Sequence, residues 1–276
     1  ATNLRILYNN LADAATITSS VTALGATSLA NIKVDSKSQV FRCSGTTVTL
    51  TATLVGSNTV GGVVIPFTNL TATATINVTL FNGATQTLTT GNVLACPYQG
   101  LGGTPWGGVP STATGYAYGA GTYARVWFTP TASTTRVTIV ITDTANTSGF
   151  LEMSRLVIGN YWSPTYNTEF GLSNSIKDTT THQRTEAGDM VSNRGIRYTG
   201  LSFNLNYMPP ADRTTWYGIM KNGGLTSPIL VSIFPNNTDD WAKERDYMVY
   251  GKLVQFGDIV HPIFNMYNTQ VEIEEI

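Results

Sequence analysis

Apolar and polar residues alternate along several segments of the first half of the chain. These segments are 46–56 (TTVTLTATLVG), 72–83 (ATATINVTLFNG) and 135–144 (TRVTIVITDT). Threonine recurs on one set of alternate positions, and valine, isoleucine or leucine recurs on the other. This period of two predicts antiparallel strands with one buried and one exposed face. A further segment, 61–69 (GGVVIPFTN), is more continuously apolar and predicts a more buried strand.

Turn-forming residues separate these segments. The clusters at 56–62 (GSNTVGG) and 82–85 (NGAT) combine glycine with asparagine, as turns do. No helix longer than two turns is indicated in this half. Short strands joined by turns are typical of jelly-roll sandwiches. We therefore predict a jelly-roll β-sandwich over residues 1–150.

The second half, residues 151–276, combines strands with one helix. Strands are predicted at 196–208, 227–235, 245–257 and 268–276. Between the first two, an early proline, the apolar set Trp216, Ile219 and Met220, and a closing Gly-Gly pair predict a helix at about 209–222. The predicted fold class is mainly β, with two sandwich or barrel domains and one short helix flanking the second.

A long segment rich in glycine and proline, residues 96–123, has no periodicity. Segments of this length in compact domains are usually functional or disordered. Its aromatic residues Trp106, Tyr116 and Tyr118 are candidates for stacking against sugar rings. Tyrosine and tryptophan are equally characteristic of subunit interfaces. Both interpretations remain open, with the interface favoured.

The chain is poor in charge, which narrows its partners. Only 12% of the residues are charged and the net charge is −1, so there is no basic surface for nucleic acid or an anionic membrane. A neutral, threonine-rich surface tends to associate, which favours an assembly component. No run of eighteen apolar residues predicts a membrane span, and the first residues do not resemble a signal peptide.

The sequence carries no recognisable catalytic or metal-binding motif. His182 and His261 are far apart and are expected in a solvated loop and a turn. Asp239 and Asp240 lack EF-hand spacing and are better explained by a polar hairpin tip. Glutamates that could serve as a hydrolytic pair, such as Glu152 with Glu169, have no distinguishing context. We expect no enzymatic activity, no cofactor and no bound metal.

Cys43 and Cys96 are the only cysteines in the chain. Two cysteines could form a single disulfide bridge. Without a secretion signal, we predict buried free thiols.

Residues 159–173 (GNYWSPTYNTEFGLS) lie where the composition changes. Nine charged residues fall in the first 150 positions and twenty-four in the remaining 126. Proline and glycine suit a change of chain direction here. We predict that Tyr161, Trp162, Pro164 and Tyr166 hold the two domains, or a domain and a neighbouring subunit, together; a ligand platform is the alternative.

Two sets of positions match a known pattern: Leu29 to Ile32 with Arg42, Ser44 and Gly45, and then the motif G-x-x-W-x-P-x-x-N within 155–173. On these positions the chain resembles tail-tip proteins of long-tailed bacteriophages, similar to distal tail or minor tail proteins. The downstream stretch 194–224 and the terminal VEIEEI follow the same pattern. The resemblance implies an N-terminal discoidin-like, carbohydrate-binding-like jelly roll and a C-terminal tail-tube-like domain.

The resemblance also implies a function as a virion structural protein. Such a protein forms a ring at the distal end of the tail tube, six-fold favoured over three-fold, and is assembled in the host cytoplasm. Its partners would be tail-tube, tape-measure, hub or fibre proteins. In this setting the terminal strand is expected to be an open edge for a neighbour's strand. Val271 and Ile273 would face inward, and Glu272 and Glu274 would face a lumen or solvent. A carbohydrate-binding virion module that contacts the host surface is the alternative.

Overall fold

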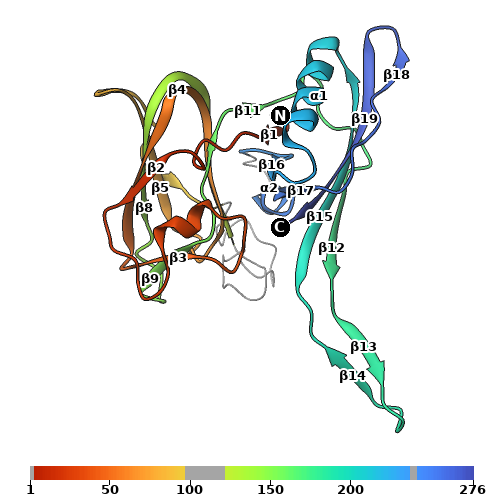
Figure 1. Ribbon diagram of the computed structural model, residues 1–276, viewed down its shortest axis with the longest axis horizontal. Helices are drawn as coiled ribbons and strands as arrows, with labels where there is room; N and C mark the ends of the chain where they lie inside the picture. The colour runs from red at the N-terminus through yellow and green to blue at the C-terminus, as the bar shows by residue number, and fades with distance from the viewer. Residues whose placement is uncertain (1–2, 97–121, 237–240) are drawn as a thin grey trace.

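The computed structural model describes residues 3–96, 122–236 and 241–276. For residues 241 and 242, at the start of a short helix, it describes the backbone alone. Two β-rich domains lie side by side (Figure 1). One is a β-sandwich, and the other is a sheet with a helix on one face and a long hairpin arm. The predicted fold class is confirmed.

Two long strands organise the sandwich. β4 (Thr47–Thr68) pairs with β8 (Thr122–Thr142) along its whole length, and the register shifts at four places. Shifts of this kind let a strand bend and pass from one layer to the other. The predicted turn at 56–62 is therefore wrong, because this cluster lies inside β4, with Gly56 at a φ of 72°.

The remaining strands of the sandwich pair around these two. One core lies between the layers, formed by alternate apolar residues of β4, β5 and β8, as the period of two predicted. Cys43 and Cys96 are buried in this core as free thiols, as predicted. The smaller elements are β2 (Thr16–Ser19), a 3₁₀ helix (Leu29–Lys33), β3 (Phe41–Ser44), β5 (Thr75–Asn82), β6 (Thr85–Thr89), β7 (Val93–Leu94), β9 (Phe150–Met153) and β10 (Val157–Gly159).

The second domain is built on a sheet with the order β11-β1-β16-β17-β19-β15-β12. A short strand, β18 (Val260–Ile263), also pairs with β19. The bounds of the other strands are β1 (Arg5–Leu7), β11 (Tyr161–Trp162), β12 (Ser173–Asp178), β15 (Arg197–Met208), β16 (Ile229–Ser232), β17 (Met248–Leu253) and β19 (Met266–Glu275).

The division of the chain differs from the predicted boundary at 150/151. β1, at the N-terminal end, pairs with β16 and β11 of the second domain, whereas β9 and β10 still belong to the sandwich. The chain thus begins in the second domain, forms the sandwich, and returns at about residue 160. The segment that enters the sandwich and the segment that leaves it are in contact at Gly159. An added Cβ at this position would lie 2.4 Å from the carbonyl oxygen of Asn9. Only glycine fits this approach.

The terminal strand is not an edge. β19 lies inside the sheet, with β17 on one side and β15 on the other, so its backbone groups are already paired. This corrects the prediction that Val271, Ile273, Glu272 and Glu274 form an open oligomer edge. Val271 and Ile273 are buried, and both glutamates lie on the other face of the sheet.

The predicted helix is present as α1 (Pro210–Gly223). It packs Trp216, Ile219 and Met220 against β15 and β19, which gives the second domain its own core. A second short helix, α2 (Trp241–Asp246), has no counterpart in the sequence analysis.

The face of the sheet opposite α1 is divided into two parts. Over β1, β16 and β17 it packs against the sandwich through Leu7, Leu230 and Tyr250. Beyond β17 the sandwich no longer covers it, and β15 and β19 expose polar side chains. β16 is accordingly buried at every position, whereas β19 alternates.

A hairpin arm extends from the edge of this sheet. β12 and β15 continue beyond the body into β13 (Thr181–Arg184) and β14 (Met190–Asn193), a separate two-stranded ribbon. Figure 1 shows this arm pointing away from both domains.

Candidate functional site

Aromatic side chains from both domains meet at their junction. Tyr161 of β11 lies edge-on against Trp127 of β8, with 5.6 Å between ring centroids. The Tyr123 hydroxyl donates to a Glu275 carboxylate oxygen at 3.2 Å and accepts the backbone N–H of Tyr250 at 3.0 Å. The prediction for Tyr161 as an interdomain residue therefore agrees with its position.

The other three residues of the predicted hinge lie within the second domain. Trp162 stacks on Trp216 of α1 at 5.9 Å, because neighbouring residues of a strand point to opposite faces of the sheet. The Pro164 carbonyl accepts a hydrogen bond from the Asn3 side chain. Tyr166 is half exposed. Trp162 and Pro164 thus make their contacts within the second domain, which corrects their expected interdomain role, whereas contact of these residues or of Tyr166 with a neighbouring subunit stays a prediction.

A buried ion pair joins the domains beside this aromatic cluster. Arg125 of β8 donates from Nε and Nη2 to the two carboxylate oxygens of Glu244 of α2, each at 2.9 Å. The Glu244 side chain is fully buried and that of Arg125 is 7% exposed. Such a bidentate pair is geometrically specific.

A second polar cluster surrounds Tyr250 at the same junction. Its hydroxyl donates to Asp35 at 2.7 Å and accepts from Arg155 Nε at 2.9 Å. Arg155 also forms an ion pair with Asp13. Burial raises the pKa of the phenols of Tyr250 and Tyr123. The junction is thus a fixed, hydrogen-bonded interface.

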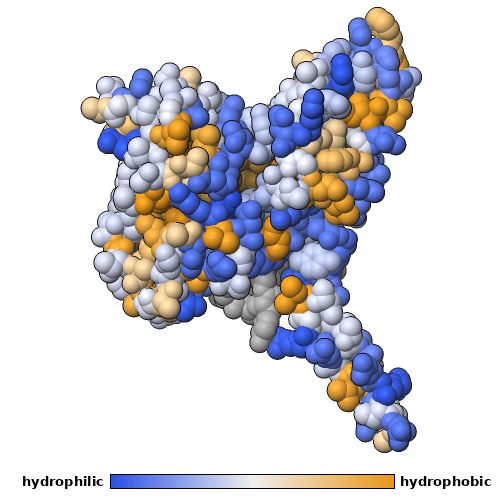
Figure 2. Space-filling model, viewed as in Figure 1, coloured by the Kyte–Doolittle hydropathy of each residue, from blue (hydrophilic) through white to orange (hydrophobic). Residues whose placement is uncertain are grey.

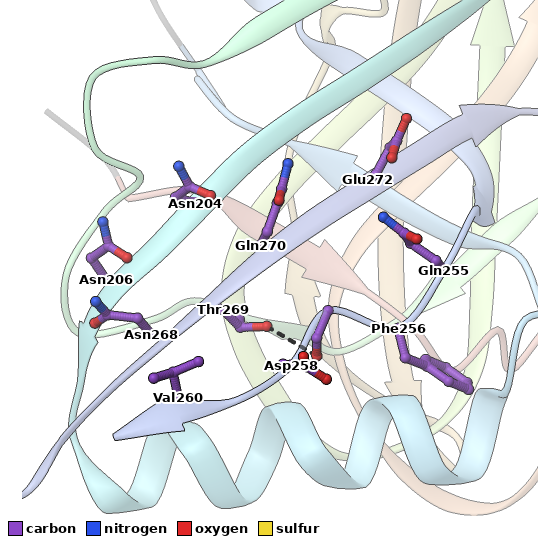
Figure 3. A pocket seen from close by; sticks show the side chains of 11 residues that line it. Asn204, Asn206, Gln255, Phe256, Asp258, Val260, Asn268, Thr269, Gln270 and Glu272 are labelled. Carbon is purple, nitrogen blue, oxygen red and sulfur yellow. Dashed lines mark hydrogen bonds between the residues drawn. The ribbon is translucent and has the colours of Figure 1, made fainter. Parts of the chain in front are cut away.

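A polar cavity opens on the uncovered part of the second sheet (Figure 3). Its volume is about 510 Å³. The floor consists of outward-facing residues of β15 and β19, and the segment after β17 forms one wall. The polar and aromatic lining residues are Asn204, Asn206, Gln255, Phe256, Asp258, Asn268, Thr269, Gln270 and Glu272.

No sequence motif marks this cavity. The available signal was the polar half of the alternation, with Ser202, Asn204 and Asn206 on one strand and Gln270 and Glu272 on another. Pairing of Asn204 with Gln270 and of Ser202 with Glu272 brings these two sets together. That register is set by the tertiary fold.

Several predicted candidates lie outside the described residues. These are the proposed sugar-stacking or interface residues Trp106, Tyr116 and Tyr118, together with Asp239 and Asp240. Glu152 and Glu169, considered above as a hydrolytic pair, bind different partners. Glu152 forms an ion pair with Arg42, and Glu169 accepts a hydrogen bond from Asn206.

The histidines are both exposed and separate. His182 lies on the hairpin arm, with Nδ1 2.7 Å from the Ser192 hydroxyl, so the expected solvated loop is a strand. His261 stacks on Tyr267 at 4.6 Å. Within the described ranges, no three potential ligands gather in a metal-binding arrangement. The helices that the structure describes are all too short or too polar to cross a bilayer.

Both projecting hairpins expose apolar side chains, as do several other parts of the surface. The arm and its base carry Ile176, Met190, Val191 and Ile196, and Figure 2 shows single hydrophobic residues among hydrophilic ones along the arm. At the other end of the sheet, the β18–β19 hairpin exposes Phe264, which is 84% accessible. Apolar side chains exposed on projecting elements are candidates for contact with another chain.

The fold and these surfaces define a two-domain β protein: a sandwich joined rigidly to a sheet-and-helix domain with projecting hairpins. No protein-family description matches the sequence, and no curated protein is significantly similar. Solved structures with partial similarity include a chitosan-binding module from a Paenibacillus chitosanase/glucanase, at 17% identity, over 55% of this chain and 99% of that one, with a TM-score of 0.38.

Two further examples are of the same kind. One is a Clostridium perfringens module in complex with GalNAc-β-1,3-galactose, at 11% identity over 55% of this chain and 100% of its own, with a TM-score of 0.38. The other is a Streptococcus pneumoniae fucose-binding module, at 13% identity over 55% and 95%, with a TM-score of 0.37. Likenesses this weak carry no argument about what this chain binds.

Proposed function

We propose that the chain is a structural subunit of a homo-oligomeric assembly. The observation that carries this proposal is the β13–β14 arm, whose strands are exposed at every position. A two-stranded hairpin without a core is marginally stable in water. Contact with a second copy of the chain would cover its apolar side chains and order it.

The placement of the hairpins supports assembly by head-to-tail contacts. The β13–β14 arm and the β18–β19 hairpin extend from opposite ends of the second domain (Figure 1). A protomer with different contact surfaces at two ends forms heterologous interfaces, which close into rings when the rotation permits. The low charge of the chain reduces the repulsion between copies.

The sequence resemblance gives this proposal its biological form. In that form the protein is a virion component of a phage tail tip, a ring that joins the tail tube to tip or fibre proteins, with six copies favoured over three. Imaging of intact virions with an antibody to the sandwich would support this if the label lies at the tail tip. Label elsewhere, or none, would contradict it.

Removal of the arm tests the assembly. Residues 180–195 would be replaced by Asn-Gly, because Thr179 and Ile196 already share backbone and side-chain hydrogen bonds. We expect the unmodified protein to oligomerise with increasing concentration in analytical ultracentrifugation, and the shortened protein to stay monomeric with unchanged circular dichroism. Val55→Ser, which changes an exposed residue of the sandwich, is the matched control. A monomeric unmodified protein, or a shortened protein that still assembles, would refute the proposal.

Carbohydrate binding by the sandwich is the second candidate function. It is favoured by the aromatic-rich segment 96–123, which the chain places between β7 and β8 of the sandwich. Trp106→Ala should then abolish binding on a glycan array without affecting oligomer mass. Retained binding would reject Trp106 as a sugar-stacking residue.

A further inference from the structure

The polar cavity beside β19 has the lining of a ligand site. Asn204, Gln255, Asp258 and Glu272 make no side-chain hydrogen bond within the described part of the chain. Amide side chains present both donors and acceptors, whereas carboxylates only accept. Figure 3 shows the amides of β15 and β19 in adjacent rows, with Gln255 and Asp258 across from them. Unused hydrogen-bonding groups of both kinds therefore face one space.

The charge of the lining selects the ligand class. Asp258 and Glu272 are the charged lining residues, and neither lysine, arginine nor histidine contributes to the cavity. Lys177, outside the lining, forms an ion pair with Glu274 on the same face and also interacts electrostatically with Glu272. A lining with two carboxylates and no cation of its own disfavours phosphates, sulfates and uronates. Among the described residues, the lining also lacks the three grouped ligands that a metal ion would need.

We infer that this cavity binds a neutral saccharide. Sugar hydroxyls both donate and accept, which matches a lining of amides and carboxylates. Phe256, half exposed at the rim, offers an apolar surface for a sugar face. A volume of about 510 Å³ is in the range of small-molecule pockets. The site lies on the second domain and is independent of the proposed self-association.

Gly257 maintains the shape of the cavity. A Cβ at this position would lie 2.0 Å from the carbonyl oxygen of Gln270, so only glycine lets the wall lie this close to β19. The backbone N–H of Val254 donates to the backbone carbonyl of Glu272, and the Thr269 hydroxyl donates to the backbone carbonyl of Gly257, which fixes both ends of the wall. The cavity is therefore formed before a ligand arrives.

The test uses the full chain with glucose, galactose, N-acetylglucosamine and lactose in saturation-transfer NMR and titration calorimetry. We expect at least one of these sugars to bind. Asn204→Ala and Glu272→Gln should each weaken binding roughly tenfold or more, as the loss of one good hydrogen bond does. Glu274→Gln is the matched control, since it lies on the same face but outside the lining, and it should bind normally.

Three outcomes would overturn the inference. One is the absence of binding by every sugar in the panel. Another is binding that survives Asn204→Ala and Glu272→Gln but disappears in Trp106→Ala, which would assign it to the sandwich. The third is glucuronate binding more tightly than glucose. Circular dichroism on each variant separates loss of binding from loss of fold, and ultracentrifugation reports on self-association separately.

Discussion

The ion pair between Arg125 and Glu244 shows how strongly the domains are joined. In Glu244→Ala, the two charge-assisted hydrogen bonds of 2.9 Å from Arg125 are lost, whereas its hydrogen bonds to the backbone carbonyls of Leu94 and Ala95 do not depend on Glu244. Removing one partner of a buried pair costs about 3–5 kcal/mol, because the remaining charge is left desolvated. We expect a loss of this size in the free energy of unfolding.

Urea denaturation followed by tryptophan fluorescence measures this loss. The double variant Arg125→Met/Glu244→Leu removes both charges and should recover most of it, since buried pairs are often replaceable by apolar residues. Asp178→Ala, which breaks an exposed pair with Arg197, should leave stability close to that of the unmodified protein. A loss below about 1 kcal/mol in Glu244→Ala, or a double variant as unstable as the single one, would refute the desolvation argument.

Three further predictions concern the cores and one tight contact. Trp162→Ala should lower the free energy of unfolding by roughly 2–3 kcal/mol, because its ring stack on α1 is lost; an unchanged melting temperature would contradict this. Burial raises the pKa of the Cys96 thiol from 9.0 to about 12, and it also raises the pKa of the Tyr123 phenol. At high pH the folded state therefore retains protons on these two groups that the unfolded chain releases. Stability should therefore be complete below pH 9 and fall as the pH rises towards 12; denaturation curves for Cys96→Ala and Tyr123→Phe should show a smaller fall. Gly257→Ala should destabilise by about 1–3 kcal/mol, whereas Gly218→Ala, where an added Cβ meets nothing, should be neutral or stabilising by calorimetry.

The strands of both domains were predictable because their signal is local. The period of two in 46–56, 72–83 and 135–144 reports which side chains are buried, whatever the partner strand is. The helix at α1 was equally predictable, from its opening proline, its apolar stripe and its closing glycines. The bend within β4 was misread, because glycine and asparagine permit a bulge as readily as a turn.

The hairpin arm and α2 had weak local signals. β13 and β14 are short, polar and fully exposed, so they lack the alternation that identifies a strand. The arm exists because β12 and β15 hold its base.

The sequence by itself determined the fold class and the helix, and it favoured free cysteines, since each follows from local pattern or composition. Only the tertiary structure decided that β1 joins the second sheet, that β19 is an interior strand, and that Asn204 lies opposite Gln270. These are pairings between residues far apart in the chain. They depend on which surfaces bury each other, and no short segment encodes that choice.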